Sequence, residues 1–369
     1  MASHSNIVYD VAIVGAGPAG CAAAVGCRAH DARVVVIEAA PAKPTDESIA
    51  WIGAAGVDFV NQCGIDAKAA KATPFQGVRL HSWDLKRRVD VDDEELTGWL
   101  VQRGTIQRAW QRVLAKAGVA ACYGERLAAL RLGEDEVELR LAGGTALRAR
   151  LVIIADGTDS ETAKLANLVA AGDSIRHPVC VQMTFEAERA GAGLDVVVGG
   201  GRGAQMATVA RLGKTVRLSV LNRDPVGSDP AEFERFVEAA RAAELVSGRA
   251  VGQAVTRASP AGVALDVESH VGKRSLLIGD AGGFVAAFSN EGIYPAMRSG
   301  SIAAETAMRA LGAAVMQDEL ATFGAAWRTE LADYIRMPNT DLSLLMPLVF
   351  NNPRMSLRVA RAFLLGQKF

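Results

Sequence analysis

The first forty residues alternate between apolar runs and small residues, a pattern typical of parallel strands joined by helices. The β-branched run Ile7–Val14 predicts a strand that is buried on both faces, and residues 33–37 predict a second one. Between them lie a glycine-rich turn, Gly15–Gly20, and an alanine-rich helix that reaches about residue 29. This order of elements predicts an α/β fold with a Rossmann-type parallel sheet.

The turn between the two strands has the spacing that a dinucleotide requires. Gly15 permits the sharp turn, Gly17 lets the backbone approach a pyrophosphate, and Gly20 lets the helix pack on the strand. The free N–H groups of the first helical turn, which includes Ala19, face the phosphates. Glu38 ends the second strand, where its carboxylate is placed to accept hydrogen bonds from ribose hydroxyls. These five residues are predicted cofactor contacts.

A motif late in the chain indicates which dinucleotide is bound. The apolar strand 275–278 ends at Gly279 and Asp280, and this acid is placed to accept a hydrogen bond from the ribityl chain of a flavin. Gly292 and Ile293 then start a helix whose N–H groups face the N1/O2 edge of a reduced flavin, which is negatively charged. The sequence therefore predicts FAD.

These residues also carry a family resemblance. The segment 279–305 closely resembles the Gly-Asp motif of the geranylgeranyl reductase family, which lies within the p-hydroxybenzoate hydroxylase superfamily of FAD enzymes. The middle motif of that superfamily is present at 155–160 and contains Asp156, after the apolar strand 151–154. The usual arginine of this motif is missing, and Lys164 is the nearest base.

Two further cofactor contacts follow from the same resemblance. The segment that starts at Gly98 is expected to form a helix to Ala117, and the resemblance implies that Arg103 contacts FAD. Leu127 is assigned to the cofactor as well. It opens a predicted β meander over residues 127–132, 137–141 and 146–150.

Two segments resemble flavin-dependent halogenases and related hydroxylases. Residues 46–51 lie where the superfamily places the chain over the flavin ring, and Ser48 is a predicted flavin contact. In 75–83 a base precedes a tryptophan by four residues, but it is Arg79 rather than the lysine of halogenases. The paired tryptophans of halogenases are absent, so halogenation is not favoured. Arg79 is the catalytic candidate, and a solvated strand residue is its alternative.

The motifs divide the chain into interleaved parts. The FAD-binding domain is predicted to be discontinuous, with residues 1–75, 95–165 and 270–315. An antiparallel, α+β substrate domain is predicted from residues 76–94 and 174–265. The remaining residues, 316–369, are predicted to form a C-terminal helical segment.

Alternating residues in the middle of the chain predict antiparallel strands. They occupy residues 179–185, 204–212 and 215–221, with Gly213-Lys214 between the last two, and a helix over 230–245 capped by Asp229 follows. Residues 199–204 also imitate a second Rossmann turn, which would imply a separate NAD(P)H domain. The alternation after this segment favours a glycine-rich hairpin instead.

The last residues form an amphipathic pattern. Met355, Val359 and Phe363 fall four apart on one helical face, in a tail with four basic and no acidic residues. A packed closing helix is the main interpretation, and peripheral contact with a membrane surface is the alternative.

Composition narrows the classes of protein further. Forty basic residues are balanced by 41 acidic ones, which excludes a strongly basic nucleic-acid-binding chain. The polar N-terminus lacks a signal peptide and no apolar run is long enough to span a membrane, which predicts a cytoplasmic protein. No metal-ligand pattern occurs. His81 and His177 are weak acid–base candidates, because a lone histidine is more often structural.

The sequence therefore predicts an FAD-dependent oxidoreductase. The favoured reaction is monooxygenation, through a flavin hydroperoxide, of a small and largely apolar or aromatic substrate. The alternatives are a geranylgeranyl reductase-like enzyme that reduces carbon–carbon double bonds, and a cyclase or binding protein that uses flavin without net redox turnover. The electron donor is expected to be NAD(P)H or a partner flavin reductase.

Overall fold

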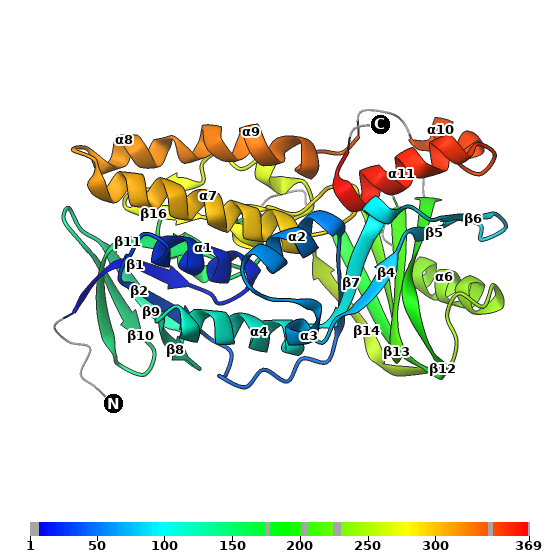
Figure 1. Ribbon diagram of the computed structural model, residues 1–369, viewed down its shortest axis with the longest axis horizontal. Helices are drawn as coiled ribbons and strands as arrows, with labels where there is room; N and C mark the ends of the chain where they lie inside the picture. The colour runs from blue at the N-terminus through cyan, green and yellow to red at the C-terminus, as the bar shows by residue number, and fades with distance from the viewer. Residues whose placement is uncertain (1–6, 174–177, 201–204, 224–229, 339–341, 368–369) are drawn as a thin grey trace.

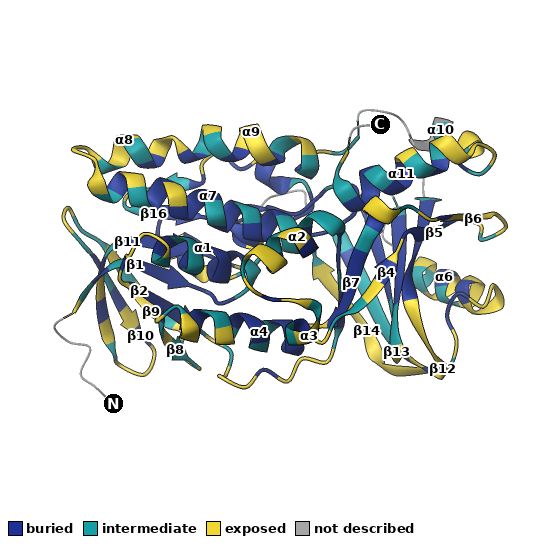
Figure 2. Ribbon diagram, viewed as in Figure 1, coloured by how far each residue is buried: buried dark blue, intermediate teal, exposed yellow. Residues whose placement is uncertain are grey.

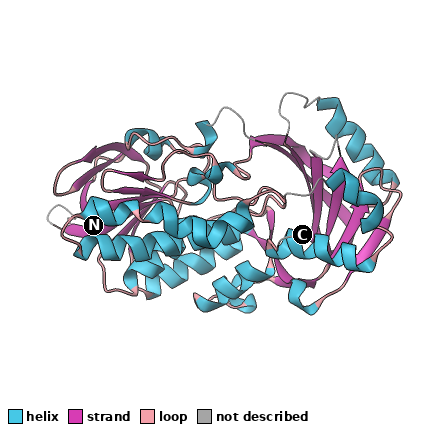
Figure 3. Ribbon diagram, turned by 90° about the horizontal axis from the view of Figure 1, so that it is seen from above, coloured by secondary structure: helices cyan, strands magenta, loops and turns pink. Residues whose placement is uncertain are grey.

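The computed structural model describes residues 7–173, 178–200, 205–223, 230–338 and 342–367. Two layers of structure lie side by side along its longest axis (Figure 1). One is built on a largely parallel sheet covered by helices, and the other on a sheet that is antiparallel except for one parallel strand pair (Figure 3).

The parallel sheet carries the first predicted strand at its centre. Its strands are ordered β15–β16–β11–β1–β2–β8. The pairs β1·β11, β1·β2, β11·β16 and β2·β8 are all parallel, as the buried apolar runs predicted. The bounds are β1 Val8–Val14, β2 Val34–Glu38, β8 Ala120–Tyr123, β11 Ala146–Ile154, β15 Val271–Gly272 and β16 Ser275–Leu277.

The predicted meander is attached to this sheet. β9 (Leu127–Leu132) and β10 (Val137–Leu141) pair antiparallel with each other, and β10 pairs with β11. The predicted strands 146–150 and 151–154 are one strand, because β11 pairs with β10 at its start and with β1 and β16 further along.

Helices built from small residues cover the sheet. α1 (Pro18–Arg28) packs closely on α7 (Ile293–Gly312), and a Cβ on Gly300 would lie 2.3 Å from the carbonyl oxygen of Ala19. The shared faces of these two helices are almost entirely buried (Figure 2). The other helices of this layer are α4 Arg103–Lys116, α5 Glu161–Leu165, α8 Met316–Ala321 and α9 Phe323–Ile335. Short 3₁₀ helices lie at Glu94–Leu96, Ala171–Asp173, Val263–Leu265 and Gly279–Gly282.

The antiparallel sheet is dominated by two long strands. β12 (Val179–Gly200) pairs along its length with β13 (Gln205–Asn222). The predicted break at Gly213-Lys214 is therefore wrong: β13 continues through it, and an irregularity in register between Glu186 and Gly191 accommodates the left-handed backbone of Gly213. The remaining strands are β5 Val78–Ser82, β6 Arg88–Val91 and β14 Arg249–Ala258, and α6 (Pro230–Ala242) packs nearby.

A small third sheet links the two layers. It consists of β3 (Ile49–Ile52), β7 (Thr97–Gln102) and β4 (Thr73–Gln76), with β7 in the middle. The helix expected from Gly98 therefore begins only at Arg103. Residues before Arg103 stay extended because β7 is hydrogen-bonded on both sides, and Gly98 lies directly against the ring of Phe75. The helices α2 (Ala54–Gln62) and α3 (Ala67–Ala70) follow β3.

The C-terminal tail is a packed helix, as its main interpretation predicted. α10 (Leu342–Val349) leads into α11 (Pro353–Leu365), where Val359 and Phe363 are buried. The ring of Phe363 stacks on Trp51 with centroids 5.3 Å apart and meets Phe288 edge-on at 5.9 Å. Within the described ranges, no helix combines the length and apolarity needed to cross a bilayer.

Candidate active site

A cavity of about 610 Å³ opens where the carboxyl ends of the parallel strands face the antiparallel sheet. Its wall includes the residues that end β1 and β2 and those that follow β11 and β16. On the other side lie residues of β12, β13 and β14. Ligands of open parallel α/β sheets bind at this edge. The volume lies within the range of roughly 300–1,000 Å³ that is usual for small-molecule sites.

Most of the predicted cofactor residues meet in this cavity. Those in its lining are Gly15, Gly17, Ala19, Glu38, Arg103, Leu127, Asp156, Asp280, Gly292 and Ile293. They come from seven separate stretches of the chain, which the fold collects around one cavity.

The glycine turn has the backbone geometry that a bound pyrophosphate needs. Gly15 has a φ of +104°, and a Cβ there would lie 2.2 Å from the carbonyl oxygen of Ala155. A Cβ on Gly20 would lie 1.9 Å from the carbonyl oxygen of Gly15, so this glycine serves the packing of α1 and stays out of the lining. A Cβ on Gly17 meets no protein atom within 4 Å and would point into open space at the N-terminus of α1. No protein atom occupies the space in front of this turn, which we call the cradle, and a ligand phosphate would fit there.

Two carboxylates in the lining are held by backbone N–H groups. Glu38 accepts hydrogen bonds from the N–H groups of Ala16 at 2.6 Å and Ala40 at 2.7 Å, which fixes its position at the end of β2. Asp156 accepts from the Thr162 N–H at 3.1 Å and from the hydroxyl of Ser160, the N-cap of α5.

Arg103, Asp280 and the first residues of α7 line one end of the cavity. The side chain of Asp280 is accessible because it faces the cavity. The surrounding protein raises the pKa of its carboxyl by keeping bulk water away, and the Arg103 guanidinium opposes that shift. Gly292 caps α7, so this helix begins where predicted, but the N–H groups of Ile293 and Tyr294 donate to Oε1 of Glu291 and are not free.

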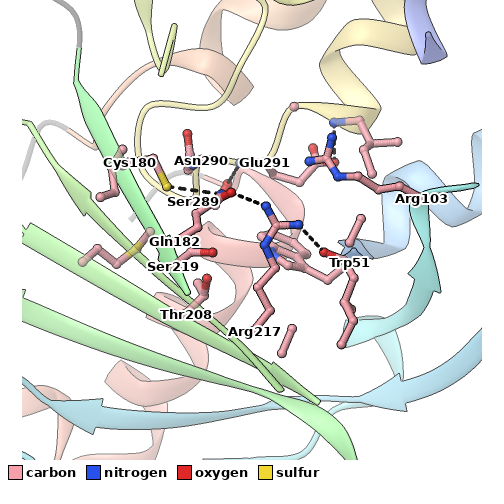
Figure 4. A pocket seen from close by; sticks show the side chains of 17 residues that line it. Trp51, Arg103, Cys180, Gln182, Thr208, Arg217, Ser219, Ser289, Asn290 and Glu291 are labelled. Carbon is pink, nitrogen blue, oxygen red and sulfur yellow. Dashed lines mark hydrogen bonds between the residues drawn. The ribbon is translucent and has the colours of Figure 1, made fainter. Parts of the chain in front are cut away.

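A smaller cavity of about 100 Å³ adjoins this end. The two cavities share Arg103, Cys180, Gln182, Arg217, Asn290, Gly292 and Ile293. Its other walls are β3, with Trp51, and the inner face of β13, with Met206, Thr208, Ser219 and Leu221. Figure 4 shows these side chains pointing toward one another from the antiparallel sheet and from the loop before α7.

Besides Gly20, three predicted site residues lie outside both linings. Gly279 has a φ of +61°, and its N–H donates to the hydroxyl of Ser299 at 3.1 Å. The carbonyl of Ser48 accepts from the Arg103 N–H at 2.9 Å, so Ser48 holds the start of α4. Arg79, the catalytic candidate, is bound instead to Asp195, at 2.8 Å through Nε and 2.7 Å through Nη2.

Asp195 is the centre of a charged cluster inside the antiparallel sheet. It is 2% exposed and binds Arg79, Arg211 and, at 2.8 Å, the Nε2 atom of His81. Burial by itself would raise the pKa of this carboxyl, but the hydrogen bonds from His81 and Arg79 and the charge of Arg211 hold it well below its usual range. His81 is thus a partner of Asp195 and lies outside the cavity lining, while His177 lies outside the described residues.

The interpretation of 199–204 as a second Rossmann turn is wrong where the structure describes the chain. β12 runs to Gly200 and pairs antiparallel with β13, which starts at Gln205. A Rossmann turn needs a helix after the glycines, and here a strand follows. Residues 201–204 lie outside the described residues.

The sequence reasoning missed Glu291, which lies in the smaller cavity. This residue is 2% exposed, and its Oε1 accepts from the N–H groups of Ile293 at 2.8 Å and Tyr294 at 2.9 Å. The Tyr334 hydroxyl donates to its Oε2 at 3.1 Å. Burial raises the pKa of the carboxyl to about 7, against the hydrogen bonds, which lower it. An acid directly before the predicted helix start was the available signal.

The raised pKa of Glu291 predicts a pH-dependent stability. The Glu291 carboxyl holds its proton more tightly in the folded protein than in the unfolded chain. Its contribution to the free energy of unfolding is therefore full below about pH 4.5 and is lost as the pH rises to about 7. This contribution is about 3 kcal/mol. Glu291→Gln should remove this part of the dependence, so the free energy of unfolding should fall less between acid and mildly alkaline pH than in the wild type. Urea unfolding of the cofactor-free protein measures the difference.

The exposed Glu268 provides a matched control, because Glu268→Gln should leave the wild-type pH dependence in place. Parallel pH profiles for Glu291→Gln and the wild type would contradict the assignment.

Comparison with known proteins agrees with this geometry. Residues 8–298 match the FAD binding domain family. The match covers most of the chain, so the protein belongs to this family of flavoprotein oxidoreductases. The predicted Rossmann-type fold and the resemblance to the reductase and hydroxylase families are confirmed.

Individual relatives include both reaction types. 3-demethoxyubiquinol 3-hydroxylase of Escherichia coli is 35% identical over 178 residues, which is 44% of this chain and 45% of the hydroxylase. The match to that hydroxylase thus spans less than half of its length. Digeranylgeranylglycerophospholipid reductase of Methanocaldococcus jannaschii is 24% identical over 345 residues, which is 89% of this chain and 85% of the reductase.

A solved structure has the same fold over nearly the whole chain. A geranylgeranyl bacteriochlorophyll reductase-like protein from Thermoplasma acidophilum superposes with a TM-score of 0.77 at 18% identity, and covers 97% of this chain and 96% of its own. This likeness concerns the fold alone.

Proposed function

We propose that the protein is an FAD-dependent monooxygenase that acts on a small, largely apolar or aromatic substrate. The observation that carries the proposal is the smaller cavity, which adjoins the cofactor cavity at the start of α7 and combines apolar walls with a few polar groups. The hydroxylase relative supports oxygen transfer over reduction, since it is the more similar in sequence within the part that it matches.

The residues of the larger cavity fit FAD. The cradle at Gly17 and the N-terminus of α1 would hold the pyrophosphate, and Glu38 the ribose of the adenosine half. Asp280 would bind the ribityl chain, and Arg103 with the N-terminus of α7 would lie beside the flavin ring. When bound, FAD supplies two electrons from its donor for the reaction with molecular oxygen.

The chain itself orients the substrate and excludes water. Trp51 is held in the wall of the smaller cavity by its stack on Phe363, whose ring Phe288 contacts edge-on. A dry wall favours transfer of one oxygen atom to the substrate, while the second oxygen atom leaves as water with two electrons and two protons. NAD(P)H or a partner flavin reductase is the proposed source of the electrons.

The reduction of carbon–carbon double bonds is the second candidate. It is favoured by the relative from Methanocaldococcus jannaschii, which matches 89% of the chain. The two reactions differ in what the product gains, since a monooxygenase adds an oxygen atom from dioxygen and a reductase adds two hydrogen atoms.

Isotope labelling separates these reactions. The FAD-loaded protein, supplied with NADH and a flavin reductase, is incubated with a panel of small aromatic and prenyl compounds under ¹⁸O₂. We expect a product that carries one ¹⁸O atom, with oxygen uptake that depends on the substrate. A hydrogenated product formed without oxygen would contradict the monooxygenase proposal, and product formation with an inert reduced-flavin analogue would indicate a non-redox role.

A further inference from the structure

Arg217 projects from β13 into the junction of the two cavities and makes no ion pair within the described part of the chain. Its Nη1 donates to the carbonyl oxygen of Ile49 at 2.6 Å, and its Nη2 donates to Oε1 of Gln182 (Figure 4). Among the described residues, no Asp or Glu forms an ion pair with it. A guanidinium has five N–H donors, so three remain for another group.

This arrangement differs from that of the neighbouring arginines in the same sheet. Arg79 and Arg211 are neutralised by Asp195, and Arg249 is paired with Glu186. Buried charges in proteins are normally paired, because the removal of an unpaired charge from water costs several kcal/mol. In the part of the chain that the structure describes, Arg217 forms no such pair, and the charge of Asp46 acts on it only from beyond ion-pair distance.

We propose that Arg217 binds a carboxylate of the substrate, which makes the substrate class a small carboxylic acid with an apolar or aromatic body. This inference rests on the proposed function for the place of the substrate. A planar carboxylate can accept two hydrogen bonds from one guanidinium, so it fits the free donors better than a neutral group does.

The surroundings of Arg217 fit such a substrate. Met206, Leu221 and Trp51 line the same cavity and would contact the apolar body, while Ser219 and Thr208 add two hydroxyl groups on the same strand. Burial lowers the pKa of Arg217 to about 10, and the charges of Arg103 and Arg257 add to this effect, while the charge of Asp46 partly opposes it. A bound anion would offset both influences.

The flavin is a less suitable partner for this cation. Arg103 lines both cavities and would offer its cation to the charged edge of the reduced ring. Arg217 is fixed between β3 and β12 by its hydrogen bonds to Ile49 and Gln182.

Binding of benzoate and benzamide to the FAD-loaded protein tests the assignment. The two probes have nearly the same shape, and at neutral pH only benzoate is charged. Isothermal titration calorimetry should show benzoate binding about tenfold tighter than benzamide or better. Arg217→Gln should remove this preference and leave the weaker affinity for benzamide within about threefold.

Two further variants keep the result interpretable. Arg249→Gln removes an exposed arginine of the same sheet and should leave the preference for benzoate unchanged. Arg217→Lys keeps the charge but loses the fork of donors, so it should fold and bind benzoate with intermediate affinity. If Arg217→Gln does not fold, the comparison of Arg217→Lys with the wild type decides the question.

Equal affinities for the two probes, no measurable binding of benzoate, or an unchanged preference in Arg217→Gln would overturn the inference. So would a shift of the flavin midpoint potential in Arg217→Gln with benzoate affinity unchanged, because the arginine would then act on the flavin. The assay requires no turnover. Selective benzoate binding without oxygen transfer would therefore contradict the proposed function and leave the carboxylate site standing.

Discussion

Replacement of Gly17 with valine is expected to give a folded protein that no longer retains FAD. The backbone of Gly17 is extended, with φ −70° and ψ −178°, so a β-branched residue is tolerated there. A Cβ at this position meets no protein atom within 4 Å, so the new side chain occupies only the cavity. Since the cradle would lie against the pyrophosphate, FAD affinity should fall by roughly hundredfold or more. The flavin content of the purified protein and a titration of the apoprotein with FAD measure this loss.

Gly312→Val is the matched control for this change. Gly312 is exposed at the end of α7, and a Cβ there also meets nothing within 4 Å, but it lies outside both cavities. It should keep full FAD occupancy and wild-type thermal stability. Full occupancy in Gly17→Val would show that the cofactor is bound elsewhere, whereas loss of fold in that variant would contradict the open space around Gly17.

Asp195→Asn should lower the free energy of unfolding more than the other substitutions discussed. The change leaves the buried side of Arg79, His81 and Arg211 without the carboxylate that joins them. Removal of one partner of a buried ion pair costs about 3–5 kcal/mol. Because Arg79 and Arg211 are partly exposed to water, we expect a loss at the lower end, about 3 kcal/mol. Because the pKa of Asp195 is lowered in the folded state, the wild-type advantage is present above about pH 4 and is lost only in stronger acid. Urea unfolding at neutral and at acid pH measures both effects.

The exposed pair of Arg88 and Asp90 on β6 gives the control within the same sheet. Both side chains are more than half exposed, so Asp90→Asn should cost less than about 1 kcal/mol. A similar small cost for Asp195→Asn would mean that the cluster contributes little to stability. A loss of FAD binding with unchanged stability would instead return Arg79 to consideration as a site residue.

The stability of the candidate site also depends on residues far from it in sequence. The C-terminal helix α11 supplies Phe363, which stacks on Trp51 in the cavity wall, and Phe288 belongs to the loop before α7. The closing helix is therefore part of the framework of the smaller cavity, although its amphipathic pattern predicted only that it would pack.

The sequence alone determined the parts of the site that depend on local backbone geometry. The turn at Gly15 needs a left-handed backbone and a close approach to Ala155, and the helix start at Gly292 follows from a change in local pattern. Such features are encoded by neighbouring residues, so spacing is enough to locate them. The break expected at Gly213 failed because a bulge in a long paired strand can absorb a glycine, and only the partner strand shows this.

The tertiary structure decided which of the arginines line the two cavities. Arg79 and Arg217 are both arginines in alternating strands, and nothing in their local sequence distinguishes them. Asp195 is 116 residues from Arg79 and is hydrogen-bonded to it across neighbouring strands, which neutralises that arginine inside the sheet. Arg217 is hydrogen-bonded to the neutral groups of Ile49 and Gln182, forms no ion pair within the described residues, and remains a cation in the cavity wall. The physical reason is that the energetic role of a charge depends on which charges and how much water surround it, and long-range strand pairing sets both.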